Sequence, residues 1–121
     1  MEVINMGTKI LDDVKQMLCI QTDVHEFDID VTSHVNSAFL VLNQLGIGPS
    51  TPFYVDSTTT WESLDTIVPK QVILDYLFLK TKLVFDPPSS SSIIEAYKDR
   101  ISELEFRMNI IVDNGGGVIS G

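Results

Sequence analysis

Four consecutive serines at residues 89–92 are the first candidates for chemistry, because their hydroxyl groups could act as nucleophiles or accept phosphate. A nucleophilic serine needs an activating base, and many hydrolases hold it in a G-x-S-x-G turn. The chain has two histidines and many aspartates, but it lacks that turn. Serine is also a preferred helix N-cap, and a helical pattern follows directly. We therefore expect one serine among residues 89–92 to cap a helix, with Ser91 or Ser92 as the favoured candidates, and we expect no catalytic site.

A metal site is the second candidate, since His25, Glu26, Asp28, Asp30 and His34 occur close together. Their spacing is not that of H-E-x-x-H, and the segment lacks the glycine and the distal glutamate of a calcium-binding loop. We interpret the segment as a solvated acidic loop followed by helix-capping carboxylates. His34 is then expected on a helix surface or at an interface, and no metal or cofactor is expected.

The charge of the chain argues against sequence-specific binding of nucleic acid. Its 121 residues fit one domain, and the net charge is −9. Residues 1–30 carry seven acidic and two basic side chains, a net charge of −5, so the negative charge is concentrated at the front. Such a surface repels phosphates. The protein could still surround DNA without gripping it.

Cys19 is the single cysteine, so no intramolecular disulfide can form, which suits a reducing compartment. It lies in an apolar helical stretch, and we expect it to be buried. The N-terminal residues show no positive region followed by an apolar core, so no signal peptide is expected. The longest apolar run, residues 38–42, is too short to cross a bilayer.

Hydrophobic periodicity predicts a mainly α fold, a small bundle of about four helices. The first is expected at about residues 9–19, with Thr8 as its N-cap. The second, at about 28–45, has the strongest apolar stripe, and Gly46 follows as a stop.

The third helix is expected at about residues 69–85, with Pro69 in its first turn. Apolar side chains cover more than half of its circumference, so it should be central and contacted on two sides. The fourth follows the serines, with apolar residues spaced like an a/d seam and a Glu103–Arg107 pair on its outside.

Residues 46–60 differ in composition, with glycines and prolines followed by residues that favour extended structure. We predict a loop with one or two short strands, or a hairpin, protruding between the second and third helices. Its glycines lack the lysine of a phosphate-binding loop. Thr59 and Glu62 have capping-box spacing, which predicts a short helix at about 60–66, with Trp61 anchored on the core.

The C-terminal residues 110–121, IIVDNGGGVISG, contain three consecutive glycines and two small apolar patches. We predict a helical domain at residues 1–109 followed by a flexible tail. The tail is either a disordered end or an arm that orders on a partner.

Several phrases in a fixed order carry a family resemblance: ILDDVKQMLCI, HVNSAFLVLNQLGIGP, TWESL and YLFLKTKLVFDPPSSSSIIEAYKDRISELEFRMN. They resemble the head–tail connector proteins (adaptor or head-completion proteins) of tailed bacteriophages and prophages of Gram-positive hosts. The resemblance covers about residues 8–109, and it is most specific around the double proline and the serines. None of these phrases is a catalytic motif.

The resemblance implies a structural protein of the virion, assembled in the host bacterial cytoplasm. It implies a ring of roughly twelve subunits below the portal protein, in a closed head-to-tail arrangement. The ring would extend the DNA channel, contact DNA without reading its sequence, and offer a platform for a stopper or tail-completion protein. No membrane partner is implied.

Three sets of residues are predicted to serve these contacts. The fourth helix and the tail are expected to contact the portal through Tyr97, Ile101, Leu104, Met108, Ile110, Ile111, Val112, Val118 and Ile119. The loop is expected to contact the next ring through Pro49, Pro52, Phe53, Tyr54 and Val55. The acids expected to face the channel are Asp23, Glu26, Asp28 and Asp30.

An alternative from another class is a small prophage regulatory protein that binds and inhibits a host target. Such a protein would form a one-to-one complex with a non-phage partner and no closed ring. Neighbouring genes for portal, capsid and tail proteins would favour the connector.

Overall fold

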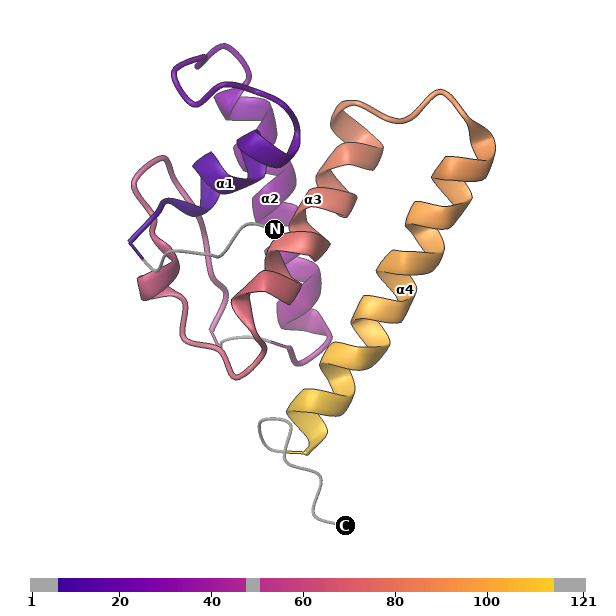
Figure 1. The fold of residues 1–121 in the computed structure, drawn as a ribbon. Coiled ribbons are helices and arrows are strands. Elements are labelled where there is room, and N and C mark those ends of the chain that lie inside the picture. The colour runs from indigo at the N-terminus through magenta and orange to yellow at the C-terminus, as the bar shows by residue number, and fades with distance from the viewer. Residues whose placement is uncertain (1–6, 48–50, 115–121) are drawn as a thin grey trace.

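Four α-helices and one short 3-10 helix make up the computed structural model, which describes residues 7–47 and 51–114 (Figure 1). This confirms the predicted mainly α fold. In chain order the elements are α1 (Ile10–Met17), α2 (Asp28–Gln44), η1 (Trp61–Ser63), α3 (Lys70–Phe85) and α4 (Ser91–Asp113).

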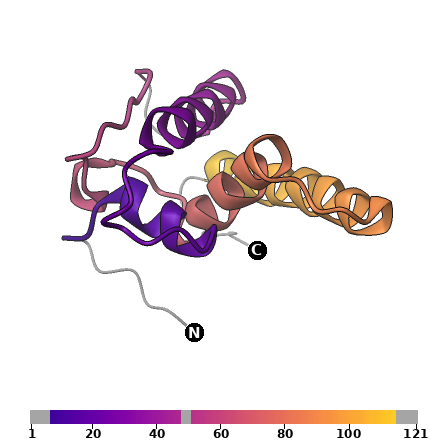
Figure 2. The same ribbon diagram turned by 90° about the horizontal axis from the view of Figure 1, so that it is seen from above.

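Helix α3 is the central element, as its broad apolar surface predicts. It contacts α1, α2 and α4, and Figure 2 shows it between α2 and α4. Ile73, Tyr76 and Leu77 are at most 1% exposed, so this helix supplies the middle of the core. Trp61 is also fully buried, which confirms its predicted anchoring role.

Helix α4 is attached to the rest of the protein through α3. Its buried residues, Ile101, Leu104 and Met108, run from the middle of the helix towards its C-terminal end. The Tyr76 hydroxyl donates a hydrogen bond of 2.7 Å to Glu105 Oε2, and burial and this acceptor raise the pKa of Tyr76. The first half of α4 therefore extends beyond the core, and Figure 2 shows its orange end as the part farthest from α1 and α2.

The described residues of the connection between α2 and α3 are held in place without a hairpin. In the described part of it, residues 51–60, no strand is found, and the isolated bridge joins Lys9 to Thr60. Val55 is bound instead by the Asn36 side chain, which accepts from its N–H at 2.6 Å and donates to its C=O at 3.1 Å. An amide side chain thus replaces a partner strand.

Several helix ends lie at other residues than the sequence predicts. Lys9, not Thr8, is the N-cap of α1, while Thr8 Oγ1 donates to Asp13 Oδ2 at 2.9 Å. Pro69 is the N-cap of α3, just outside its first turn. A serine of the 89–92 run is the N-cap of α4, as predicted, but it is Ser90 and not Ser91 or Ser92, and its side chain makes no capping bond.

Further corrections concern the short helix, the cysteine and the end of α4. The helix η1 is shorter than predicted. Its N-cap is Thr60 and not Thr59, because Thr59 Oγ1 bonds with Asp56. Cys19 is exposed, since α1 ends at Met17 and Cys19 then adopts a φ of 63°. Helix α4 continues to Asp113, past the predicted start of the tail at residue 110.

Candidate interaction surfaces

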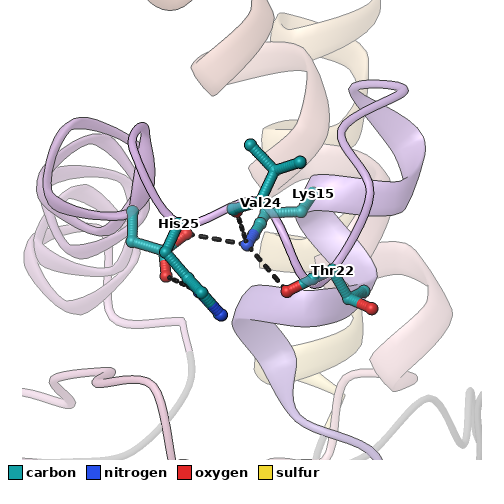
Figure 3. A network of polar contacts seen from close by, with 5 residues as sticks. Lys15, Thr22, Val24 and His25 are labelled. Carbon is teal, nitrogen blue, oxygen red and sulfur yellow. Dashed lines mark hydrogen bonds and ion pairs between the residues drawn. The ribbon is translucent and has the colours of Figure 1, made fainter.

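A buried lysine organises the acidic front of the protein. Lys15 is 1% exposed, and its Nζ donates to the Val24 carbonyl at 2.6 Å and to the Thr22 carbonyl at 3.3 Å. The same ammonium lies 2.7 Å from Asp28 Oδ1. Figure 3 shows Lys15 reaching from α1 into the turn before α2. One side chain therefore joins α1, the connecting turn and the first residue of α2.

Asp28 is the centre of charge pairing in this network. Its Oδ2 lies 2.9 Å from His25 Nδ1, while its Oδ1 faces Lys15. The hydrogen bond from Lys15, followed by that from His25, lowers the pKa of Asp28. The negative charge of Asp28 is thus compensated within the chain.

The sequence reasoning missed Lys15, although a signal was present. Lys15 follows Leu11 by four residues and precedes Leu18 by three, so it lies on the apolar face of the first helix. A lysine on such a face must find acceptors or lose its charge, since an unpaired buried ammonium is very costly.

The four acids predicted to face the channel divide into two groups. Asp23, Glu26 and Asp30 are exposed, and they remain candidates for a charged surface. Asp28 is paired with the buried ammonium and is only 23% exposed, so it serves the fold in this chain. The reason is its position at the start of α2, directly opposite Lys15.

The residues of α4 predicted as portal contacts also divide. Ile101, Leu104 and Met108 are at most 8% exposed and belong to the core, so they hold α4 on α3. Tyr97 is half-buried beside Phe78, with ring centroids 6.3 Å apart.

The end of α4 offers more accessible apolar side chains. Ile110 is 37% exposed, whereas Ile111 and Val112 are partly buried against the core. Phe106 is 66% exposed, and the sequence reasoning omitted it because it lies off the a/d seam. Phe106 and Ile110 are four residues apart and are therefore neighbours on one helix face. Two further predicted contacts, Val118 and Ile119, lie outside the described residues.

In the loop predicted to contact a neighbouring ring, exposed side chains alternate with side chains packed on the core. Tyr54 is 66% exposed and Pro52 is exposed as well. Phe53 packs on Phe39 with ring centroids 5.0 Å apart, and Val55 is 4% exposed. Phe53 and Val55 therefore fix the loop, while Tyr54 points outward between them. Pro49, also predicted here, lies outside the described residues.

Within residues 7–47 and 51–114, no three His, Cys, Asp or Glu side chains are grouped so that they could hold a metal ion. Among the helices of that same part, none has both the length and the apolar character needed to cross a membrane. His34 lies in a groove between α2, α3 and α4, in keeping with its predicted place on a helix surface.

Comparison with known proteins gives one match that covers most of the chain. A family model described as phage connector protein matches residues 10–115. The matched range includes all five helical elements and the residues of the buried Lys15 network. No curated protein matches the chain significantly. No solved structure does so either.

Proposed function

The chain belongs to the phage connector protein family, and we propose that it is the subunit of a ring that joins the portal of the capsid to the tail. Membership makes the protein a connector component of a phage particle. The ring, its seat below the portal and its roughly twelve subunits are the proposed refinement. In this role the protein contributes surfaces and a channel wall, and no catalysis.

The observation that carries the portal contact is the exposed apolar face of α4. Phe106 and Ile110 lie on this face, while Leu104 and Met108 hold the helix on α3 from another side. Exposed apolar side chains on a rigidly held helix are typical of protein interfaces, where large apolar residues provide most of the affinity. Tyr97, Ile111 and Val112 would extend this contact at its margins.

The loop at residues 51–60 is the proposed contact with the next ring, a stopper or tail-completion protein. Asn36 binds the backbone of Val55, and Phe53 packs on Phe39, so Tyr54 is held outward before any partner arrives. Such preorganisation lowers the entropic cost of association.

The acidic front is the proposed channel wall. Asp23, Glu26 and Asp30 are exposed and lie beside the turn fixed by Lys15. A wall of like charge repels the phosphates of passing DNA, which lets the duplex move without being retained.

Assembly with the portal tests this proposal. The purified chain of 121 residues is mixed with a portal protein from the same phage, and the products are weighed by mass photometry and imaged by electron microscopy. We expect a ring of this protein seated on the portal. Changing Phe106→Ser together with Ile110→Ser should abolish the complex and leave the helical circular dichroism signal intact.

A matched control removes an exposed apolar side chain elsewhere. Ile67 is 53% exposed and precedes α3, so Ile67→Ser should assemble as the unchanged chain does. If the unchanged chain forms neither a ring nor a portal complex, the proposed function is wrong. If the Phe106 and Ile110 variant still assembles, α4 is not the portal contact.

A further inference from the structure

A groove runs between α2 and α4 over the surface of α3. Its volume is about 580 Å³. The residues along its apolar part come from all three helices: Ala38, Val41, Leu83, Val84 and Ile101. Val84 is 61% exposed, although it lies on the central helix of the bundle. The isolated chain therefore leaves part of its central helix uncovered.

The groove is lined by two lysines, Lys80 and Lys98, and by one carboxylate, that of Glu105. Lys80 lies 6.0 Å from the ring centroid of Tyr76, and Lys98 approaches Glu95 only to 3.9 Å. Both side chains line the groove.

Most other basic residues are engaged within the chain. Lys15 and Lys82 pair with Asp28 and Asp86 at 2.7 Å and 2.8 Å. Arg100 and Arg107 both pair with Glu103. With two lysines and one glutamate along it, the groove is more positive than the chain as a whole, whose net charge is −9, so an acidic surface would be favoured there.

A complementary surface lies on another side of α2. It is a shallow hollow of about 420 Å³, lined among others by Leu11, Ile29, Thr32 and Asp56. Ile29 is 85% exposed, an unusual degree for a large apolar side chain. Thr58 and Thr59 donate hydrogen bonds to the Asp56 carboxylate, and these bonds lower the pKa of Asp56.

The two surfaces lie on either side of the buried stripe of α2. His34 faces the groove and Asn36 faces the hollow, and two residues along an α-helix correspond to a rotation of about 200°. One helix therefore presents an apolar groove with lysines on one side and a protruding isoleucine with an acid on the other.

We propose that the groove receives a second copy of this chain, whose Ile29 enters it while Asp56 faces Lys80 and Lys98. This inference rests on the proposed ring and assigns its subunit contact. A closed head-to-tail ring needs two different, mutually complementary surfaces on each subunit. The groove and the Ile29 surface meet that requirement, since they differ in shape and charge and share no lining residue.

Site-specific cross-linking tests the contact in the ring assembled on the portal. Cys19 is exposed and is first changed to serine, so that only introduced cysteines react. Ile29→Cys and Val84→Cys are then combined in one chain, and a short bismaleimide is added. Both side chains are exposed, so both changes should leave the fold intact. We expect a ladder of covalent dimers, trimers and larger species.

The single variants distinguish a head-to-tail contact from a symmetric one. Ile29→Cys alone and Val84→Cys alone should give no cross-linked dimer, because neither site meets its own copy. A chain with Ile67→Cys and Val84→Cys serves as the matched control and should give no ladder. Dimers from a single variant would overturn the head-to-tail assignment.

Charge reversal provides an independent readout. Lys80→Glu combined with Lys98→Glu should abolish ring formation, and adding Asp56→Lys should partly restore it. Rings seen by electron microscopy without the Ile29–Val84 ladder would overturn this surface assignment and leave the proposed function standing. Absence of any ring from the unchanged chain would overturn the proposed function, and this contact with it.

Discussion

The buried ion pair between Lys15 and Asp28 is the residue-scale feature with the clearest energetic consequence. Changing Asp28→Asn removes the carboxylate from an ammonium that is 1% exposed. Because a buried charge then keeps only carbonyl partners, we expect a loss of about 2 kcal/mol in the free energy of unfolding. Urea unfolding at neutral pH measures the loss. Asp23→Asn, which changes an exposed acid nearby, should have almost no effect.

The same pair gives the protein a defined sensitivity to acid. The pKa of Asp28 is lowered in the folded chain by the hydrogen bonds from Lys15 and His25. Its contribution is therefore complete above the ordinary aspartate pKa of about 4, and it is lost as the pH falls through the lowered value. Comparing urea unfolding at neutral and strongly acidic pH should show a smaller acid-induced loss in Asp28→Asn. An equal loss in both chains would mean that Asp28 is not paired when folded.

Asn36 has a second residue-scale role, because its amide occupies both backbone groups of Val55. We expect Asn36→Ala to lower the free energy of unfolding by about 2 kcal/mol, since two hydrogen bonds are lost near a buried side chain. Asn36→Asp keeps an acceptor for the Val55 N–H, so its free energy of unfolding should lie between those of the unchanged chain and Asn36→Ala. Hydrogen exchange at Val55 reports the local effect, and unchanged protection in Asn36→Ala would contradict it.

The sequence predicted contacts that follow from helical spacing, and it missed those that depend on irregular segments. The Glu103–Arg107 pair and the burial of Trp61 are confirmed, because spacing along a helix or sheer apolar size decides them. Asn36 binds the backbone of Val55, and Lys15 binds two carbonyls of the turn before α2 and the carboxylate of Asp28. The positions of these partners depend on the whole fold, so no local pattern indicates them.

At the scale of elements, two features can fix the angle between α3 and α4. They are the two prolines in the connection and the packing of α4 on α3. Asp86 ends α3 with a φ of −150°, and Pro87 and Pro88 follow before α4 begins. Changing both prolines to alanine should cost roughly 1 kcal/mol, because the unfolded chain gains freedom. We expect a larger effect on ring assembly with the portal, since α4 would leave the bundle over a wider range of angles.

Mass photometry of the portal mixture checks this prediction, with Ser89→Ala as the control in the same connection. An unchanged yield of assembled ring would show that the contact between α3 and α4, including the Tyr76–Glu105 hydrogen bond of 2.7 Å, fixes the angle by itself.

The helices themselves were predictable, because apolar periodicity persists over many residues and averages out local exceptions. Their ends were less so. Thr8 and Thr59 look like capping residues in sequence, but each bonds with a nearby aspartate in the fold. The outer face of α4 was also missed: Phe106 lies off the apolar seam, and only the folded chain shows that α3 leaves it uncovered.

At the scale of the whole molecule, the position of the negative charge matters more than its amount. If the acidic front lines the channel, changing Asp23, Glu26 and Asp30 to lysine should make the assembled ring retain DNA. The retention should weaken as salt increases, because each phosphate contact releases counterions. A mobility-shift assay with linear duplex DNA over a range of salt concentrations measures both effects.

The matched control applies the same change in charge to another exposed surface. Glu95, Asp99 and Asp113 lie on α4 and are exposed, so changing these three to lysine alters the net charge equally. Assembly of both variants is verified by electron microscopy before DNA is added. We expect strong retention only when the front is reversed, because a channel surrounds the duplex with every subunit at once. Equal retention by the two variants would mean that net charge alone governs binding. It would then contradict the placement of the acidic front on the channel wall.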